Sequence, residues 1–254
     1  MFTEERLAKI LELLKINGKV NVNELSETFN VTKDCIRKDL KQLELAGNLQ
    51  RTYGGALPIE KKISIYDISE REKADIETKQ IIAAKALNLI EECDTIFLDM
   101  STINILIARL LLKTRKKITV VTNMLEIMTI LAHSNTNITL VATSGVYNKN
   151  LHGFIGSPTI DLIKKYIFDK SFIGNCGVNL ETNDLTTFEL EDGITKKVIL
   201  ESSKKAFLVM EQKKFYTQGN YKFATFKGVF GVITNTEPSE DICRKLSEQQ
   251  VNLF

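Results

Sequence analysis

The sequence has few of the residues that build metal sites and disulfides. Its 254 residues include only two histidines, His133 and His152, which have no metal-ligand spacing to each other or to a cysteine. The four cysteines lie far apart and form no Cys-x-x-Cys pair: Cys35, Cys93, Cys176 and Cys243. We expect free thiols that are mostly buried. The sequence therefore predicts no metal site, and we expect no cofactor.

The chain also lacks long apolar runs and a large excess of charge. No run approaches the roughly 18 residues that a membrane span needs, and residues 1–6 lack the basic-then-apolar order of a signal peptide. We therefore expect a cytoplasmic protein without a membrane partner. The formal net charge is only +2, so a DNA-binding surface would require basic residues concentrated on one face. The length is sufficient for one small and one medium domain.

Three short helices are predicted at the start of the chain. Apolar residues from Leu7 to Leu14 recur at the i, i+3, i+4, i+7 spacing of one helix face. After a short extended piece around Val20, Asn23 is placed to cap a second helix. Thr32 is placed to cap a third, which we expect to end at Gly47. Two short helices joined by a tight turn behind a first helix match the helix-turn-helix pattern.

The third of these helices carries a basic face. Its cations lie off the apolar stripe, at Lys33, Arg37, Lys38 and Lys41. Such cations can reach phosphates and the acceptor edges of bases in a major groove. Asp39 faces the core side of the helix, and we expect an internal ion pair or hydrogen bond for it because an acid is a poor phosphate contact. The alternative is that these charges form only a solvated helix face.

A hairpin follows the third helix. Residues 49–56 read as two short strands with Gly54-Gly55 at the tip, which is typical of a wing. We therefore predict a winged helix-turn-helix over residues 1–58 that binds double-stranded operator DNA, with a linker over 59–75. The candidate DNA-binding residues are Thr32, Lys33, Asp34, Ile36, Arg37, Lys38, Lys41, Arg51 and Tyr53.

Apolar strands and amphipathic helices alternate in the remaining residues, 76–254. We expect strands at Thr95–Leu98, Ile118–Val121, Ile138–Val141, Ser171–Ile173, Ala206–Met210 and Val229–Ile233. We expect helices over residues 76–90 and at Asn104–Leu112, Leu125–Leu131, Thr159–Tyr166, Glu191–Ser203 and Ser239–Gln249. This alternation predicts a larger α/β domain with a mostly parallel sheet covered by helices.

Polar residues follow several of the expected strands. Ligands of such sheets bind beyond the carboxyl ends of the strands, and backbone N–H groups and hydroxyls at a helix start can hold a phosphate. Together the strand exits favour a small polar anion such as a sugar phosphate. The candidate effector-binding residues are Asp99, Ser101, Thr102, Asn123, Ser144, Gly145, Glu191 and Lys214.

Several of these segments resemble the DeoR family of repressors. They are Val31–Leu40, Arg51–Ala56, Thr95–Asp99, Thr119–Asn123, Asp169–Gly174 and Lys214–Phe215. Arg71 and Lys79 also match positions in the family's lead-in helix. The resemblance covers nearly the whole chain. It implies a sensor domain that is related in fold to sugar-phosphate isomerases and that binds a phosphorylated sugar or polyol. Several positions depart from the family pattern, and they include Lys38 and residues 100–103. Lys38 replaces an arginine, which keeps the charge but loses the guanidinium fork, and residues 100–103 replace a Ser-Gly-Thr-Thr phosphate loop and lose its glycine.

These observations predict a DNA-binding repressor of a carbohydrate-metabolism operon whose operator affinity is modulated by a phosphorylated sugar or polyol. Two winged helix-turn-helix domains bind the two half-sites of an operator, so we expect a homodimer or homotetramer. One alternative is an isomerase-like or deaminase-like enzyme with acid–base groups among Asp99, Glu191, Asp192, Glu211 and Lys214. No motif fixes a nucleophile, a base and an orienting group together, so we expect no catalytic residues. The other alternative is a DNA-binding protein whose large domain only oligomerises.

Overall fold

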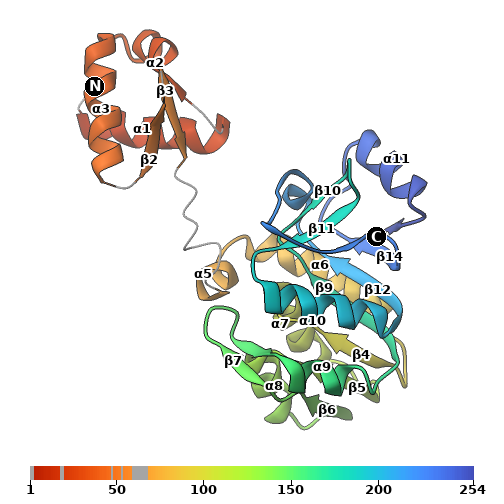
Figure 1. Cartoon of the computed structure of the whole chain (residues 1–254). Helices are drawn as coiled ribbons and strands as arrows, with labels where there is room; N and C mark the ends of the chain where they lie inside the picture. The colour runs from red at the N-terminus through yellow and green to blue at the C-terminus, as the bar shows by residue number, and fades with distance from the viewer. Residues whose placement is uncertain (1–2, 18–19, 47, 53, 59–67) are drawn as a thin grey trace. The chain divides into compact units, whose positions relative to one another are not determined.

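The computed structural model describes residues 3–17, 20–46, 48–52, 54–58 and 68–254 (Figure 1). The chain divides into two units, Met1–Lys62 and Ile63–Phe254. Within the ranges just given, no helix has both the length and the apolar character that crossing a bilayer requires.

The first unit is a three-helix winged helix-turn-helix. Its elements are α1 (Thr3–Asn17), β1 (Val20–Asn21), α2 (Val22–Phe29), α3 (Lys33–Leu45), β2 (Leu49–Thr52) and β3 (Gly55–Pro58). The strands pair antiparallel in the order β1-β3-β2. Ile10 of α1, Leu25 of α2, and Ile36 and Leu40 of α3 pack with Leu49 of the wing into one buried cluster. The predicted hairpin is thereby confirmed as part of the core of this unit.

Local hydrogen bonds set the helix starts. The Thr32 hydroxyl accepts a hydrogen bond from the N–H of Cys35 at 3.2 Å, which confirms the predicted cap of α3. The prediction that Asn23 caps α2 is wrong. Asn21, already in extended backbone, accepts from the N–H of Asn23 at 2.8 Å, so the helix begins at Val22. The predicted stop at Gly47 lies outside the described residues.

The two glycines at the tip of the wing serve different purposes. Gly54 has a φ of +86°, a left-handed conformation that side-chain-bearing residues adopt at a cost. Gly55 allows a close approach, because a Cβ there would lie 2.1 Å from the carbonyl oxygen of Val20 on β1. The wing can therefore pack against β1 only because residue 55 has no side chain.

A seven-stranded sheet forms the centre of the second unit. Its strands are β4 (Thr95–Leu98), β5 (Ile118–Thr122), β6 (Ile138–Ala142), β9 (Phe168–Gly174), β12 (Ser203–Val209), β14 (Val229–Ile233) and β15 (Asn252–Leu253). Their order is β15-β14-β12-β9-β4-β5-β6, and every neighbouring pair is parallel. From β4 the chain builds outward through β5 and β6, and then returns to the other side of β4 as β9. The topological switch point therefore lies between β4 and β9, where such sheets bind ligands.

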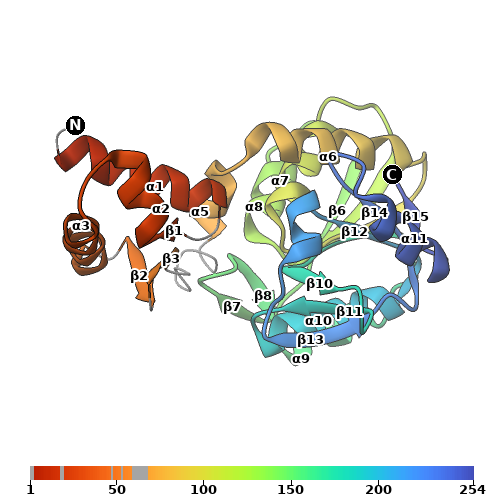
Figure 2. The ribbon, with the colours of Figure 1, turned by 90° about the horizontal axis from the view of Figure 1, so that it is seen from above.

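Helices cover both faces of this sheet. They are α5 (Ile68–Lys73), α6 (Ile76–Leu89), α7 (Thr102–Leu111), α8 (Leu125–Ala132), α9 (Ser157–Ile163), α10 (Leu190–Glu201) and α11 (Glu240–Glu248). Side chains alternate along β4. Ile96 and Leu98 pack with α6 and α7, whereas Phe97 packs in a second cluster with α9, α10 and α11. Figure 2 shows α6 and α7 on one side of the sheet and α9 and α10 on the other.

Small antiparallel pieces that the sequence analysis missed lie beside this sheet. They are the hairpin of β7 (Val146–Asn148) and β8 (Gly153–Ile155), and a sheet of β10 (Gly177–Asn179), β11 (Asp184–Thr187) and β13 (Tyr221–Thr225). They are short and mix polar with apolar residues, so they show no clear alternation. The expected parallel strands and their helices are all present, with bounds that differ by a few residues.

Two further expectations are wrong. Part of the expected linker, residues 59–75, forms α5, whose Ile68 is buried in the core of the second unit; residues 59–67 lie outside the described residues. The thiols are free but not mostly buried: Cys93 is exposed, in a turn with a φ of +65°, and the other three are half-buried. His152 contacts Glu126, with 2.6 Å between Nδ1 and Oε1, which is a local partner within this unit.

Candidate nucleic-acid interface and ligand site

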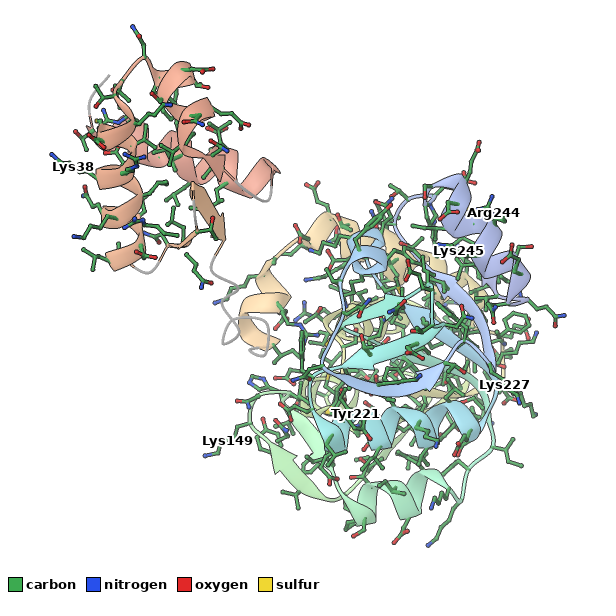
Figure 3. All side chains as sticks on the ribbon, turned by 45° about the horizontal axis from the view of Figure 1, so that its top comes forward. Lys38, Lys149, Tyr221, Lys227, Arg244 and Lys245 are labelled. Carbon is green, nitrogen blue, oxygen red and sulfur yellow. The ribbon has the colours of Figure 1, made fainter. Side chains whose placement is uncertain are left out.

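The basic face predicted for the third helix is on the surface of the first unit. Lys33, Lys38 and Lys41 of α3 are all exposed. None of them forms an ion pair with another described residue of the chain. Figure 3 shows Lys38 pointing away from the body of this unit. Three ammonium groups on one helix face are therefore free to contact an external anion.

Two arginines of the same surface are held by acids. Arg37 Nη1 lies 2.8 Å from Oδ1 of Asp34, with 60% and 80% of the two side chains exposed. Arg51 on the wing lies 3.8 Å from Glu44, which also accepts a hydrogen bond from the N–H of Arg51 at 2.9 Å. Exposed pairs of this kind contribute about 0–1 kcal/mol. Either guanidinium can therefore exchange its carboxylate for a phosphate or a base edge at little cost.

A hollow of about 390 Å³ lies between α3 and the wing. Arg37, Arg51 and Gly54 are among its lining residues. Two further candidates of the predicted DNA-binding set need separate comment. Ile36 is completely buried in the core, so its side chain cannot contact DNA and its inclusion was wrong. Tyr53 lies outside the described residues.

An internal ion pair fixes α3 against α1. Arg6 donates from Nε to Oδ2 of Asp39 at 2.6 Å and from Nη2 to Oδ1 at 3.0 Å. Only 8% and 5% of the two side chains are exposed. The hydrogen bonds from Arg6 to Asp39 raise the pKa of the guanidinium. The internal role predicted for Asp39 is confirmed, and the pair orients the face of α3 that carries the lysines.

The switch point of the large sheet is closed by hydrogen bonds between β4 and β9. Asp99 follows β4, is completely buried, and accepts a hydrogen bond on Oδ2 from the N–H of Gly174 at 3.0 Å. The amide of Asn104 on α7 donates to the carbonyls of Asp99 at 2.8 Å and Phe172 at 2.7 Å. These hydrogen bonds join β4 and β9, which are far apart in the sequence, at the edge where a ligand is expected.

A buried lysine neutralises two acids below this point. Lys196 Nζ lies 2.5 Å from Oδ2 of Asp99 and 2.9 Å from Oδ1 of Asp192. The Thr187 hydroxyl donates to Oδ2 of Asp192 at 2.6 Å. Oδ1 of Asp99 is buried without a hydrogen-bond partner in the described part of the chain. One acceptor of the cluster is thus left for a hydroxyl donor.

Burial and neighbouring charges shift the pKa values of Asp99 and Lys196 in opposite directions. Burial raises the pKa of Asp99, although the charge of Lys196 opposes this. Burial alone would lower the pKa of Lys196, but the charges of Asp192 and Asp99 outweigh it and raise the pKa. The lysine therefore stays charged, and the cluster has a fixed ammonium between two carboxyl groups.

Three other predicted ligand residues also lie at this edge of the sheet. Ser101 and Thr102, at the start of α7, are buried, and the Ser101 hydroxyl accepts a hydrogen bond from the N–H of Ile103 at 3.2 Å. Asn123, after β5, donates to the carbonyl of Phe154 at 3.2 Å, while its own Oδ1 has no partner among described residues. The Ser101 oxygen is thus occupied as a helix cap, whereas the oxygen of Asn123 is available.

The structure does not bring three other predicted ligand residues, Ser144, Gly145 and Glu191, to the switch point. Ser144 and Gly145 follow the edge strand β6, two strand spacings of about 4.8 Å away from β4. They lead into the β7–β8 hairpin, where the carbonyl of Ser144 accepts a hydrogen bond from Thr159 at 2.6 Å. Glu191 is exposed on the first turn of α10. Its neighbour Asp192 has the buried position instead.

Lys214 is the predicted cation that does reach this edge. It lies in the short 3₁₀ helix η1 (Gln212–Tyr216), is half-buried, and donates to the carbonyl of Asn175, just after β9, at 2.6 Å. Burial, together with the charge of Arg71, lowers the pKa of Lys214 to about 8. A small hollow beside it is lined by Arg71, Leu151, Cys176, Thr187, Phe188, Glu189 and Asp192.

Sequence reasoning missed three residues of this site. Lys196 and Arg71 were not considered as ligand residues, and Asp192 was named only for the enzyme alternative. A signal for one pair exists in the sequence, because Asp192 and Lys196 are four residues apart on a helix whose neighbouring positions Val198 and Ile199 are buried. Charges within an apolar helix stripe indicate a buried ion pair. For Arg71 the signal is its match to a position in the family's lead-in helix.

Comparisons with known proteins found two transcriptional repressors and one solved enzyme structure that are similar to this chain. The chain is 34% identical over 219 residues to the lactose phosphotransferase system repressor of Lactococcus lactis subsp. lactis, covering 85% of this chain and 84% of that protein. It is 27% identical over 244 residues to the glycerol-3-phosphate regulon repressor of Escherichia coli (strain K12), covering 96% and 95%. Ribose 5-phosphate isomerase A of Methanocaldococcus jannaschii aligns over 56% of this chain and 55% of its own, at 15% identity and a TM-score of 0.41.

Family models cover both units. The model of the DeoR-like helix-turn-helix domain matches residues 6–62, and the model of the DeoR C-terminal sensor domain matches residues 74–236. The second match alone spans more than half of the chain. This chain belongs to the DeoR family of helix-turn-helix transcriptional regulators.

Proposed function

We propose that this chain is a repressor that binds operator DNA through α3 and the wing, and whose operator affinity changes when a phosphorylated sugar or polyol binds above the switch point. The relatives named above are repressors of a lactose phosphotransferase system and of a glycerol-3-phosphate regulon. Both names point to operons that handle small phosphorylated carbohydrates or polyols. A regulator of this kind must reach the bacterial chromosome, and we therefore predict that the protein is cytoplasmic.

The exposed basic face of α3 carries the DNA part of this proposal. Lys33, Lys38 and Lys41 have no acidic partner among the described residues, and Thr32 fixes the start of the helix. Free cations on a recognition helix supply phosphate contacts, and Arg37 supplies a fork for the O6 and N7 acceptors of guanine. A winged head reads one half-site, so we also propose that a homodimer or homotetramer binds the operator.

The ligand part rests on the mixture of groups at the switch point. The free oxygens of Asp99 and Asn123 can accept hydrogen bonds from hydroxyls, and Lys214 supplies a cation for a phosphate. Binding rather than catalysis is the proposed role. Asp192 is already engaged by Lys196, and Glu211 lies 2.8 Å from Lys213.

Binding to the promoter beside its own gene tests the DNA part. Fluorescence anisotropy with a labelled promoter fragment and a scrambled fragment of equal length should show tighter binding to the promoter and a steep loss of affinity with salt. Equal affinity for both fragments, or no binding at all, would overturn the proposal.

A thermal-shift screen tests the ligand part. A bound sugar or polyol phosphate should raise the melting temperature by mass action, and the unphosphorylated compound should not. The hit should then change promoter affinity. A hit that is chemically converted by the purified protein would support an enzyme, and a complete absence of hits would support a large unit that only oligomerises.

A further inference from the structure

The strand β6 is an open edge of the seven-stranded sheet. It pairs with β5 alone, in an unbroken parallel register, and no other strand in the described part of the chain pairs with its outer side (Figure 1). None of its five residues is buried, and Thr139 and Ala142 are exposed. A row of backbone N–H and C=O groups therefore faces outward without a neighbouring strand.

The outward backbone groups belong to alternate residues of β6. The N–H of Thr143, just after the strand, donates to the carbonyl of Thr122 on β5 at 3.0 Å. Backbone groups of successive residues in a strand point in opposite directions, so those of Ile138, Leu140 and Ala142 point away from β5. These three residues are spaced symmetrically about Leu140. The edge is therefore complementary to itself when a second copy is turned by half a rotation about that residue.

β6 has none of the features that usually keep sheet edges from pairing. Such edges are protected by lysine or proline residues, by a bulge, or by being very short. The sequence of β6 is Ile-Thr-Leu-Val-Ala, and its register with β5 shows no bulge. The opposite edge of the sheet, β15, has only the two residues Asn252 and Leu253. Of the two edges, β6 alone is long enough to accept a further strand.

Charged residues are missing from the whole segment around this edge. They make up 26% of the chain, yet residues 127–148 contain no Lys, Arg, Asp or Glu, and this is the longest such stretch of the sequence. The segment includes most of α8, which packs against β6, and extends to Val146 and Tyr147 of β7, which are 68% and 39% exposed. Depletion of charge is typical of the core of a protein–protein interface. The composition of this surface therefore favours a protein partner.

A second copy of this chain is the partner that fits the edge. In a two-fold interface, a residue near the axis lies close to the same residue of the other copy, so a charge there would be repelled by its equal. The uncharged segment avoids this repulsion. A nucleic acid would require cations, and residues 127–148 contain neither lysine nor arginine.

We propose that two copies of this chain pair through β6 in antiparallel orientation, with the two-fold axis at Leu140, so that one sheet continues through both sensor units. This inference rests on the proposed function, because it assigns the surface that joins the proposed homodimer or one pair of the homotetramer. Leu140 then exchanges hydrogen bonds with Leu140 of the partner subunit, and Ile138 with Ala142 of the partner subunit. The two α8 helices flank the joined strands on the same face of the sheet.

The mass of the full chain without DNA tests this interface. Sedimentation should show wild type as a dimer or tetramer at micromolar concentrations. Thr139→Lys places a cation on each side of the axis and should raise the dissociation constant by about tenfold or more. Ala142→Pro removes an outward N–H and should have the same effect, because proline is tolerated where the N–H of an edge strand faces outward.

Thr236→Lys is the matched control for these variants. Thr236 is exposed in the loop after β14, so the same substitution there should leave the mass unchanged. A monomeric wild type overturns the proposal. It is also overturned if both edge variants have the mass of wild type at every concentration.

A disulfide cross-link tests the position of the axis in the intact interface. Residues that exchange hydrogen bonds across an antiparallel pair have Cα atoms about 5.5 Å apart, which a disulfide can span. Leu140→Cys should therefore form a covalent dimer on mild oxidation. Thr139→Cys should form much less, because its counterpart is a diagonal neighbour with Cβ atoms about 7–8 Å apart. Wild type, with its four free cysteines, gives the background. Equal cross-linking of all three proteins contradicts the proposed axis.

Promoter binding separates this inference from the proposed function. Thr139→Lys should bind the promoter fragment about tenfold more weakly than Thr236→Lys, because only a dimer places two heads on two half-sites. A wild type that cross-links through Leu140→Cys but binds no promoter would contradict the proposed function and support this interface. Promoter binding by wild type, together with unchanged mass in both edge variants, would contradict this inference alone.

Discussion

Lys196 Nζ lies 2.5 Å from Oδ2 of Asp99, with 3% and 0% of the two side chains exposed. The lysine is on α10 and the acid follows β4, so the pair joins a covering helix to the end of a central strand. Asp192 completes the cluster from one helical turn away. A charge placed so deeply is tolerated only because partners surround it.

Removing this lysine should therefore destabilise the sensor unit strongly. Lys196→Met leaves two buried carboxyl groups without their cation, and we expect the free energy of unfolding to fall by about 3–5 kcal/mol. Lys197→Met is the control, since Lys197 is 58% exposed and lies 4.0 Å from Glu201. That change should cost less than about 0.5 kcal/mol. Urea denaturation measures both, and equal values for the two variants would contradict the prediction.

The ion pair between α1 and α3 should matter in the same way for the first unit. Asp39→Asn leaves the guanidinium of Arg6 nearly buried without a counter-charge, and we expect a loss of about 3 kcal/mol. Asp34→Asn breaks the exposed pair with Arg37 and should change stability by less than about 1 kcal/mol. Hydrogen exchange of amides in α1 and α3 reports this unit separately. Protection that is equally retained in both variants would show that the Arg6 pair is dispensable.

Arg37 and Lys38 should affect operator binding differently. Arg37→Ala should cost about 1–3 kcal/mol of promoter affinity and relax the sequence preference, because a bidentate base contact is lost. Lys38→Ala should weaken binding to promoter and scrambled DNA alike and reduce the salt slope by about 1. Lys245→Ala on α11 of the sensor unit, which Figure 3 labels, should change neither. Loss of preference in Lys38→Ala with none in Arg37→Ala would reverse the two roles.

Phosphate affinity should depend on pH through Lys214. The pKa of this lysine in the free protein is lowered to about 8, so its ammonium is mostly present at pH 7 and mostly lost at pH 9. A bound phosphate favours the ammonium and raises this pKa, so binding takes up a proton at alkaline pH. Affinity should therefore fall as pH rises above about 8, by up to about tenfold per unit.

Three variants separate the contributions to this profile. Lys214→Arg keeps its positive charge over the whole pH range, so its phosphate affinity should fall less steeply with pH. Lys214→Gln should bind phosphate weakly, with an affinity that does not change with pH. Cys176→Ser is the control for a neighbouring group, because Cys176 also acts on the ammonium of Lys214. This variant should retain the pH profile of wild type. A fall of affinity that persists unchanged in Lys214→Arg would assign the titration to another group.

Most of the fold could be predicted because its signals are local. The strand Thr95–Leu98 has the same bounds in the prediction and in the structure, and Thr32 caps the helix that it was expected to cap. Apolar runs, helical spacing and capping residues depend on neighbours within a few positions. The short antiparallel strands escaped because a piece such as Gly177–Asn179 is too short to show a period.

The exposure of the basic face of α3 was also predictable, although Ile36 was wrongly included among its candidate residues. That residue is on the same helix as the exposed lysines, but its spacing places it on the apolar stripe with Leu40. The residues of the proposed ligand site were predicted less well. Ser144, Gly145 and Glu191 follow strands or begin a helix as expected, yet they do not lie at the switch point.

By itself, the sequence determined the winged head, the parallel sheet and the basic face of α3, because periodicity and capping operate over a few residues. Only the tertiary structure decided which charged groups meet. Lys196 and Asp99 are 97 positions apart, and Arg71 and Lys214 come from opposite ends of the sensor unit. Whether a charge lies inside a protein, and beside which partner, depends on how distant segments pack, because that packing alone sets its distance from water.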